Sequence, residues 1–260
     1  MVTLVTPGSS KASVESRVLP EVMVRGAAET DSGAIAEDAF DELGDLFDKA
    51  DAIAIGSGMS QGESTAAFVL RVVAECRQPL ILDADALNVL APFGANWPPA
   101  DAGGSAIILT PPPKEVLRLL GDGEDPPVGE TPPTLLRKEG SLIKDRVAAV
   151  REFSQKHNVI LVLKGERVLI GEPGGKVVVN PTGNSGLGKA GNGDTLAGIL
   201  AGFVAQAAKM NIDIFETVVA AVYVAGMAGD IAEKKFGKRV MTASDVRECL
   251  VEAFAKLEKG

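Results

Sequence analysis

Short runs of aliphatic and β-branched residues alternate along the chain with longer segments in which apolar residues recur every three or four positions. Several short runs are apolar on both faces, which is typical of parallel strands covered by helices on two sides. The predicted strands are VTLV (2–5), VMV (22–24), AIAIG (52–56), PLILD (79–83) and AIILT (106–110). The predicted helices span 63–77, 114–120, 141–156, 194–208, 214–235 and 243–257. This alternation predicts an α/β protein, a three-layer α/β/α sandwich around a mostly parallel sheet.

The later strands break this rhythm. VILVLKG (159–165), RVLIGE (167–172) and KVVVN (176–180) follow one another with only short polar turns between them. Three strands without intervening helices predict an antiparallel meander at the edge of the sheet. The segment 121–134 is rich in Pro, Gly and acidic residues, and we expect a mobile surface loop there, with the preceding helix ending at Gly121. Because strands continue beyond this loop, residues 1–260 are predicted to form a single domain.

Composition narrows the range of function classes. Hydrophobic residues make up 46 % of the 260 residues and aromatic residues only 4 %, so Ala, Gly, Val and Leu must form a close-packed core. The net charge of −9, without a local basic stripe, argues against nucleic acid and anionic membranes as partners. The longest purely apolar run, 196–205, is too short to span a bilayer.

The few cysteines and the single histidine exclude several kinds of site. Cys76 and Cys249 are far apart and lack metal-ligand spacing, which fits a reducing cytoplasm better than a disulfide scaffold. His157 is the only histidine, so neither a His-based zinc site nor a Ser-His-Asp relay is available. The N-terminal segment also lacks the pattern of a secretory signal. We therefore expect a cytoplasmic protein.

The segment NPTGNSGLGKAGNGDTLAGILAGFVAQ (180–206) carries the strongest chemical signal. Glycines at 183, 186, 188 and 191 precede Gly193 and Asp194, where an apolar helix begins. Glycines let backbone N–H groups approach a ligand, and a helix start favours negative charge. Tight turns and a helix-terminal Asp would explain Asp194 alone, but not glycines spread over a dozen positions. The segment from Gly183 to Asp194 is therefore predicted to cradle an anion such as phosphate.

Polar residues also follow two predicted strands at the edge where open α/β sheets bind ligands. In GSGMSQGES (56–64), the glycines 56 and 58 indicate either a tight turn or a ligand site. In LDADALNVL (82–90), Asp83 is expected near a site, whereas Asp85 is expected to cap the following helix. In VLKGERVLI (162–170), Lys164 lies in a turn between strands, where a lysine is usually exposed to solvent.

Taken in order, these segments resemble the ADP/ATP-dependent NAD(P)H-hydrate dehydratases, a branch of the ribokinase-like superfamily. The matching blocks are LPEVMV, IAIGSGM, LILDADALNVL, ILTPPPKE, VLKGERVLI, the 180–206 segment and AAVYVAGMAGDIA (220–232). The resemblance implies a ribokinase-like fold and a repair reaction. NADHX or NADPHX is dehydrated to NADH or NADPH by phosphorylation of a hydroxyl, with ADP or ATP as co-substrate, followed by loss of phosphate.

The resemblance also implies roles for individual residues. Asp194 matches the catalytic carboxylate beside the substrate hydroxyl. The implied nucleotide-binding residues are Lys164, Gly165, Glu166, Arg167, Val168, Gly191, Asn192 and Gly193, and the implied substrate-binding residues are Gly56, Gly58, Asp83, Asn184 and Asp194. Mg²⁺ is expected with the nucleotide, although no carboxylate cluster has unambiguous ligand spacing. ADP is expected over ATP because the sequence contains no fused epimerase domain.

The sequence departs from the family pattern at three places. The usual TPHPGE block is TPPPKE here, so Pro112 replaces a histidine and Lys114 a glycine. Ala225 stands where histidine is common. A strand, glycine-rich turn and helix that normally precede the VTLVTP segment are not in this sequence, so backbone groups or apolar faces at its N-terminal end are expected to be exposed.

Two other functions remain open at this stage. A ribokinase-like small-molecule kinase acting on a vitamin-precursor alcohol would share the Asp194 site but release a stable phosphate ester. An inactive nucleotide-binding paralogue would be consistent with Pro112 and with the absent N-terminal piece. A homo-oligomer and functional pairing with a separate NAD(P)HX epimerase are also expected from the resemblance.

Overall fold

The computed structural model describes residues 1–94, 97, 105–121 and 142–258, and the side chains of 142–145 are left out of the description. Most of the predicted loop at 121–134 lies outside these residues, so its mobility stays a prediction. The strands are β1 (Val2–Pro7), β2 (Val22–Ala27), β3 (Ile53–Ile55), β4 (Leu80–Leu82), β5 (Ile107–Leu109), β6 (Ile160–Leu163), β7 (Leu169–Gly171) and β8 (Val177–Val179). The α-helices are α1 (Lys11–Glu15), α2 (Ala39–Glu42), α3 (Gly44–Phe47), α4 (Glu63–Glu75), α5 (Asp85–Leu90), α6 (Pro113–Leu120), α7 (Leu142–His157), α8 (Asn192–Met210), α9 (Ile214–Phe236), α10 (Ala243–Glu248) and α11 (Leu250–Leu257), with short 3₁₀ turns η1 (Gly8–Ser10) and η2 (Ser185–Leu187).

Six strands form the main sheet in the order β3-β4-β5-β6-β7-β8. β3, β4, β5 and β6 are parallel to one another, whereas the β6–β7 and β7–β8 pairs are antiparallel. The prediction of a mostly parallel sheet with a late antiparallel meander is therefore confirmed. The strands are short, but the residues of β4, β5, β6 and β7 are almost completely buried, as the apolar runs indicated.

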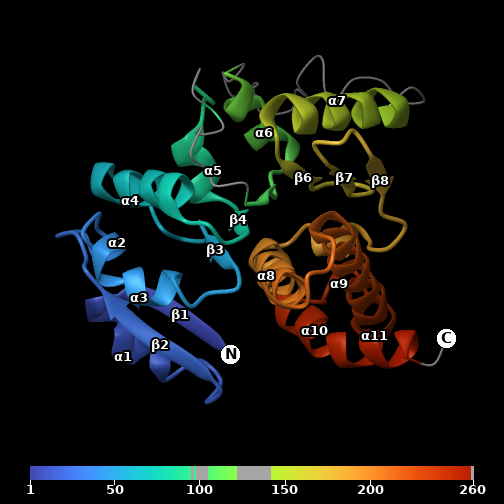
Figure 1. Cartoon of the computed structure of the whole chain (residues 1–260). Coiled ribbons are helices and arrows are strands. Elements are labelled where there is room, and N and C mark those ends of the chain that lie inside the picture. Colours follow the sequence, from blue (N-terminus) through green and yellow to red (C-terminus); the bar gives the residue numbers. More distant parts are fainter. Residues whose placement is uncertain (95–96, 98–104, 122–141, 259–260) are drawn as a thin grey trace.

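Alternate residues of the same strands build two separate cores, because successive side chains of a strand point to opposite faces. Leu80, Leu82 and Leu109 belong to a cluster shared with α4, α5, α6 and α7. Ile81 and Ile108 belong to a second cluster shared with α8 and α9. Helices therefore cover both faces of the sheet, α4 to α7 on one side and α8 and α9 on the other, with α10 and α11 packed against α8 and α9 (Figure 1). This is the predicted three-layer α/β/α sandwich.

The first two strands form a sheet of their own. β1 and β2 pair in parallel with each other and, among the described residues, with no strand of the six-stranded sheet. The expectation that all early strands join one sheet was wrong on this point, since apolar alternation cannot distinguish one sheet from two. Val2, Leu4 and Met23 are 60 %, 41 % and 44 % exposed, which confirms the expected apolar exposure at the N-terminal end.

Helix boundaries follow local signals. Pro113 occupies the first turn of α6, and Gly121 ends that helix in the left-handed conformation with φ of +79°, as predicted. The predicted helix 243–257 is instead two helices, because Cys249 interrupts it without changing the apolar periodicity. The short helices α1, α2 and α3 were not predicted.

Among the described residues, α9 is the one helix long and apolar enough to cross a membrane by length and composition. Of its most apolar stretch, 56 % is buried inside the protein. Its apolar residues pack against α8, α10 and α11, as those of a core helix do.

Candidate active site

The carboxyl ends of four parallel strands meet at one edge of the main sheet. Because β3, β4, β5 and β6 run in the same direction and in register, the residues that follow them lie close together. Those residues are Gly56, Asp83, Thr110 and Lys164. The edge therefore combines a carboxylate and an ammonium group from strands that are distant in sequence.

Lys164 and Asp83 form an ion pair at this edge. The Nζ atom of Lys164 donates a hydrogen bond of 2.7 Å to Oδ1 of Asp83. Only 4 % of the Asp83 side chain and 23 % of the Lys164 side chain are exposed. A lysine in a turn between strands is usually exposed, but Lys164 is held at this edge because the buried carboxylate supplies the opposite charge that a half-buried ammonium group requires.

The turn after β3 packs against the turn after β4. Gly56 has φ of +125°, and a Cβ atom there would lie 1.8 Å from the carbonyl oxygen of Asp83, so only glycine fits. Asp85 does not cap α5, whose N-cap is Ala84. Its carboxylate instead accepts hydrogen bonds of 2.9 Å from the N–H of Ser60 and from the side chain of Gln61. Asp85 therefore holds the loop that contains Gly58, and its predicted capping role was wrong.

The start of α8 faces the ion pair. Asn192 is the first residue of α8, and Gly191 precedes it in the left-handed conformation. A Cβ atom on Gly193 would lie 3.6 Å from Nζ of Lys164 and 3.6 Å from Oδ2 of Asp83. The backbone N–H groups of Gly193 and Asp194 have no hydrogen-bond partner within the described parts of the chain, as is usual in a first helical turn. Two free N–H groups, a helix dipole and an ammonium group thus converge on one place.

Asp194 lies in the first turn of α8, exposed to solvent, and its carboxylate accepts no hydrogen bond from any described residue. A carboxylate beside an anion-binding helix start is available to accept a proton from a bound hydroxyl group. The observed position agrees with the prediction that Asp194 stands next to the cradle.

Only the second half of the predicted cradle can bind an anion. The N–H of Gly183 donates to Oδ2 of Asp230 at 2.9 Å, and the N–H of Gly186 donates to Oδ1 of Asn184 at 2.9 Å. These two N–H groups are therefore unavailable to a ligand. The prediction of one continuous cradle over 183–194 was wrong in this respect, since internal acceptors satisfy its first half.

The turn from Lys164 to Val168 joins β6 to β7 at the same edge. Gly165 and Arg167 have positive φ angles of +136° and +54°. Arg146 of α7 supports the turn, because its guanidinium group donates a 2.9 Å hydrogen bond to the carbonyl of Glu166. Burial lowers the pKa of Arg146, and its Nε atom is buried without a partner.

Two further charged residues at the site were not predicted, Arg146 and Glu115. Glu115 belongs to the TPPPKE segment, and its Oε2 atom is buried without a hydrogen-bond partner. Burial raises the pKa of Glu115 to about 7, although the neighbouring charge of Lys164 acts to lower it. The sequence could have indicated Glu115 by its position, in the first turn of a helix that follows a strand ending at the same edge.

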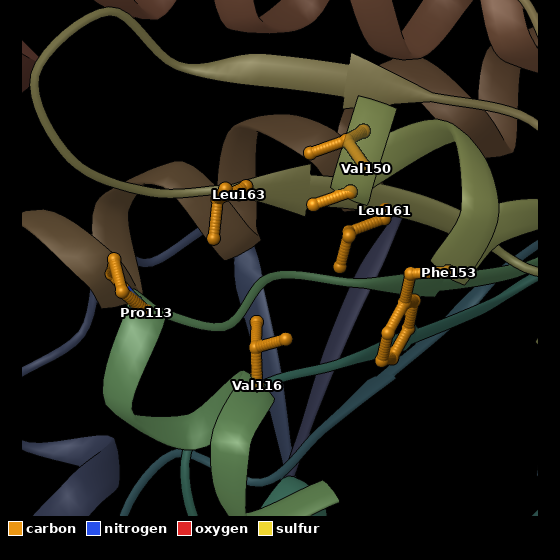
Figure 2. A pocket seen from close by; sticks show the side chains of 7 residues that line it. Pro113, Val116, Val150, Phe153, Leu161 and Leu163 are labelled. Atoms are coloured by element: carbon orange, nitrogen blue, oxygen red, sulfur yellow. The ribbon is translucent and has the colours of Figure 1, made fainter. Parts of the chain in front are cut away.

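A small apolar cavity lies beside the site, between α6, α7 and β6 (Figure 2). Its lining consists of Pro113, Val116, Ala149, Val150, Phe153, Leu161 and Leu163. None of these side chains can take part in acid–base or ionic chemistry, so the cavity is a packing feature. No group of three or more His, Cys, Asp or Glu residues among the described ones is arranged to hold a metal ion.

Comparison with known proteins is consistent with this geometry. The family model Carb_kinase, described as NAD(P)H-hydrate dehydratase, matches residues 1–252. The chain is 34 % identical over 239 residues to a bifunctional NAD(P)H-hydrate repair enzyme of Moorella thermoacetica, covering 92 % of this chain and 41 % of that protein. It is 32 % identical over 202 residues to an ADP-dependent (S)-NAD(P)H-hydrate dehydratase of Neisseria meningitidis, covering 74 % of this chain and 62 % of that one. The chain thus spans about two fifths of the length of the bifunctional relative.

A solved structure shares most of this architecture. The ADP/ATP-dependent NAD(P)H-hydrate dehydratase of Bacillus subtilis, co-crystallized with ATP and Mg²⁺ and soaked with CoA, superposes with a TM-score of 0.72 at 28 % identity. The match covers 98 % of this chain and 82 % of that chain. A ribokinase-like protein of Enterococcus faecalis gives the same TM-score of 0.72 at 25 % identity, covering 98 % of this chain and 76 % of that chain. The ribokinase-like fold is therefore shown.

Proposed function

Because this chain belongs to the NAD(P)H-hydrate dehydratase family, we propose that it converts NADHX or NADPHX back to NADH or NADPH, with ADP or ATP consumed. The observation that carries this proposal is the convergence of Lys164, the free N–H groups of Gly193 and Asp194, and the Asp194 carboxylate at the start of α8. Such a site binds phosphate next to a group that can accept a proton.

The nucleotide would lie between the β6–β7 turn and the start of α8. Its terminal phosphate would meet the ammonium group of Lys164 and the N–H of Gly193, while the turn from Gly165 to Val168 would contact the rest of the nucleotide. Gly191 and Asn192 would flank the phosphates. Among the described residues, no group of three or more His, Cys, Asp or Glu side chains is arranged to hold a metal ion here. Mg²⁺ would therefore arrive with the nucleotide phosphates, whose charge it would neutralise.

Asp194 would act as the base of the reaction. It would accept the proton of the substrate hydroxyl as that oxygen forms a bond to the terminal phosphorus atom and the bond to the leaving phosphate oxygen breaks. The resulting phosphate ester would then lose inorganic phosphate from one ring carbon and a proton from the neighbouring carbon, which restores the ring double bond of the nicotinamide. Phosphate is a better leaving group than hydroxide, so the nucleotide drives the dehydration.

The substrate would reach this site over the β3 and β4 turns. Gly56 and Gly58 keep this approach free of side chains, and a Cβ on Gly58 would meet no atom within 4 Å. Asp83 would orient Lys164, in addition to the contact of Asp83 with the substrate that the family resemblance implies. Pro112 offers no donor where a histidine is usual, so the substrate would depend more on backbone groups here.

The test is a turnover assay with NADHX and either ADP or ATP. We expect recovery of the NADH absorbance band, and we expect the Asp194→Asn variant to lose about 10²- to 10⁴-fold in rate with nearly unchanged ADP affinity. Asp51→Asn is a matched control, because Asp51 precedes β3 at the opposite sheet edge and is exposed. A wild-type rate in Asp194→Asn would remove Asp194 from the mechanism. A stable phosphate ester on an alcohol would indicate a small-molecule kinase, and nucleotide binding without turnover would indicate an inactive paralogue.

The surroundings of the reaction belong to the same proposal. We expect the protein to be a cytoplasmic homo-oligomer. We also expect it to work with a separate NAD(P)HX epimerase, because an enzyme that acts on one epimer of the hydrate leaves the other behind. Light scattering of the purified protein would give the oligomeric state. Faster consumption of mixed NADHX epimers when an epimerase is added would support the pairing.

A further inference from the structure

The segment before α8 lies along helix α9 instead of crossing open solvent. The hydroxyl of Thr182 donates a 2.9 Å hydrogen bond to the backbone carbonyl of Tyr223 in α9. A Cβ on Gly226 would lie 2.2 Å from that hydroxyl oxygen, and a Cβ on Gly229 would lie 2.8 Å from both methyl carbons of Leu187. Two glycines of α9 therefore let the segment approach the helix backbone closely.

Asp230 and Asn184 hold the segment in this place. Asp230 accepts the Gly183 N–H with Oδ2 at 2.9 Å and the Asn184 side-chain amide with Oδ1 at 3.1 Å. The same amide donates to the carbonyl of Gly229 at 3.0 Å. Oδ1 of Asn184 in turn accepts the Gly186 N–H. These bonds, here named the Asn184–Asp230 latch, connect residues 46 positions apart.

The far end of the segment is also fixed. The Nζ atom of Lys189 donates to the carbonyls of Arg239 and Met241 at 2.9 Å and 2.8 Å. Lys189 thus uses its ammonium group to hold the loop before α10. Between the two attachments the chain makes one 3₁₀ turn and then enters α8 at Asn192.

We propose that Asp230 and Asn184 are positioning residues of the nucleotide site. By fixing where the segment 180–189 lies on α9, the latch sets where the N–H groups of Gly193 and Asp194 stand relative to Lys164. This role rests on the proposed function for the identity of the ligand, an adenine nucleotide. Asn184 then acts through the backbone instead of touching the substrate, since both of its amide hydrogens are already donated within the protein.

The first test is the Asp230→Asn variant. Both carboxylate oxygens of Asp230 accept hydrogen bonds, but an amide has one acceptor and one donor group. Whichever way the new amide turns, one donor faces another donor. We expect the KM for ADP or ATP to rise about tenfold, the loss of one charged hydrogen bond, while kcat changes by less than about threefold. A merely structural defect would lower the active fraction, and hence the apparent kcat, without raising KM.

The matched control is Glu233→Gln on the same helix. Glu233 pairs with Lys238 at 3.3 Å and takes no part in the latch. We expect wild-type kinetics from it.

Exchanging the two residues tests whether the hydrogen bond between positions 184 and 230 positions the segment. It separates this bond from the effect of each substitution on its own. Asn184→Asp alone places two carboxylates together and removes the donor to Gly229, so its KM should be raised most. In the double variant Asn184→Asp/Asp230→Asn, the new amide at 230 donates to the carboxylate at 184 and accepts the Gly183 N–H. The carboxylate at 184 still cannot donate to the carbonyl of Gly229, so we expect the nucleotide KM of the double variant to lie below that of Asn184→Asp but above that of wild type.

A readout without nucleotide separates failure of the latch from failure of the proposed function. Amide hydrogen exchange at Gly183 should be faster in Asp230→Asn than in wild type, while exchange at Leu200 in the middle of α8 stays the same. If the enzyme does not dehydrate NADHX, calorimetric binding of ADP or ATP replaces the KM measurement. The proposal is overturned if Asp230→Asn binds nucleotide as wild type does, if the double variant is no better than Asn184→Asp, or if the wild-type protein binds neither nucleotide.

Discussion

Lys164 and Asp83 are 81 residues apart in the sequence, yet their side chains are joined by a 2.7 Å hydrogen bond at the edge of the sheet. The pair fixes the ammonium group beside Gly193, where the backbone N–H groups of α8 begin. Since Asp83 is almost completely buried, its negative charge depends on Lys164, and the position of Lys164 depends on Asp83. Positive charge is thus placed at the helix start before any ligand binds.

Replacing Asp83 should affect stability and nucleotide affinity together. We expect Asp83→Asn to lower the free energy of unfolding by about 2 kcal/mol, the contribution of a hydrogen bond between charged groups, and to raise the nucleotide KM. Urea unfolding and initial rates would measure the two effects. The exposed pair of Lys209 and Asp51, at 3.9 Å, is the control, and Asp51→Asn should cost less than about 0.5 kcal/mol. Equal costs in the two variants would contradict a structural role for the buried pair.

Gly193 offers a test that separates binding from folding. A Cβ there makes only ordinary contacts at 3.6 Å, so Gly193→Ala should fold normally and gain up to about 1 kcal/mol in helix stability. The same methyl group would occupy the space beside Lys164, so nucleotide affinity should fall. Gly202→Ala in the same helix, where a Cβ meets nothing within 4 Å, should show the gain in melting temperature without the loss of affinity. Unchanged nucleotide binding in Gly193→Ala would place the phosphates elsewhere.

The raised pKa of Glu115 predicts a pH-dependent stability. The folded protein keeps the proton on Glu115 up to about pH 7, whereas the unfolded chain releases it near the ordinary value of 4.5. Unfolding therefore releases a proton between these two values, and the contribution of Glu115 to stability becomes less favourable as pH rises through this interval. Below 4.5 both states are protonated and the effect vanishes.

Glu115→Gln imitates the protonated group at every pH. We expect its urea midpoint to equal that of wild type at about pH 4 and to exceed it at about pH 8. A constant difference between the two proteins across this range would mean that Glu115 titrates normally.

The apolar cavity beside α6 can be filled. Val116 lies on its wall and is 3 % exposed (Figure 2). Val116→Ile adds one methylene to an apolar space that holds no polar group for water, so stability should increase by about 0.5–2 kcal/mol. Val73→Ile in α4 is the contrasting variant, because Val73 is 1 % exposed and does not line the cavity. There the added carbon should cost about 1 kcal/mol through overpacking, and calorimetric melting would compare the two.

The layered fold could be predicted because its signals are local. The apolar runs of β4, β5 and β6 are buried on both faces, and the short polar turn around Pro173 indicates antiparallel strands. The separate β1–β2 pair could not be predicted, since the side-chain pattern of a strand does not name its partner.

At the site, the sequence indicated which residues lie together but not which hydrogen-bond partners they have. A lysine in the position of Lys164 is usually exposed, and Asp85 was expected to cap a helix, but both have hydrogen-bond partners from distant segments. The two halves of the glycine segment look alike in sequence. What distinguishes them is Asp230, an acceptor 47 residues beyond Gly183 that only the packing of α9 brings close.

The order of the main sheet has a consequence for how the chain folds. Every hydrogen-bonded neighbour in this sheet is also the next strand along the chain, so the sheet can grow one strand at a time by closing relatively short loops. Asp83 follows β4 and Lys164 follows β6, so their contact requires β5 between them, and the site also requires α8 to be packed against this edge. The nucleotide site therefore exists only in the fully assembled protein. A nucleotide that binds only this finished state should raise the stability of the native protein by about 2.7 kcal/mol at a concentration of about 100 times its Kd.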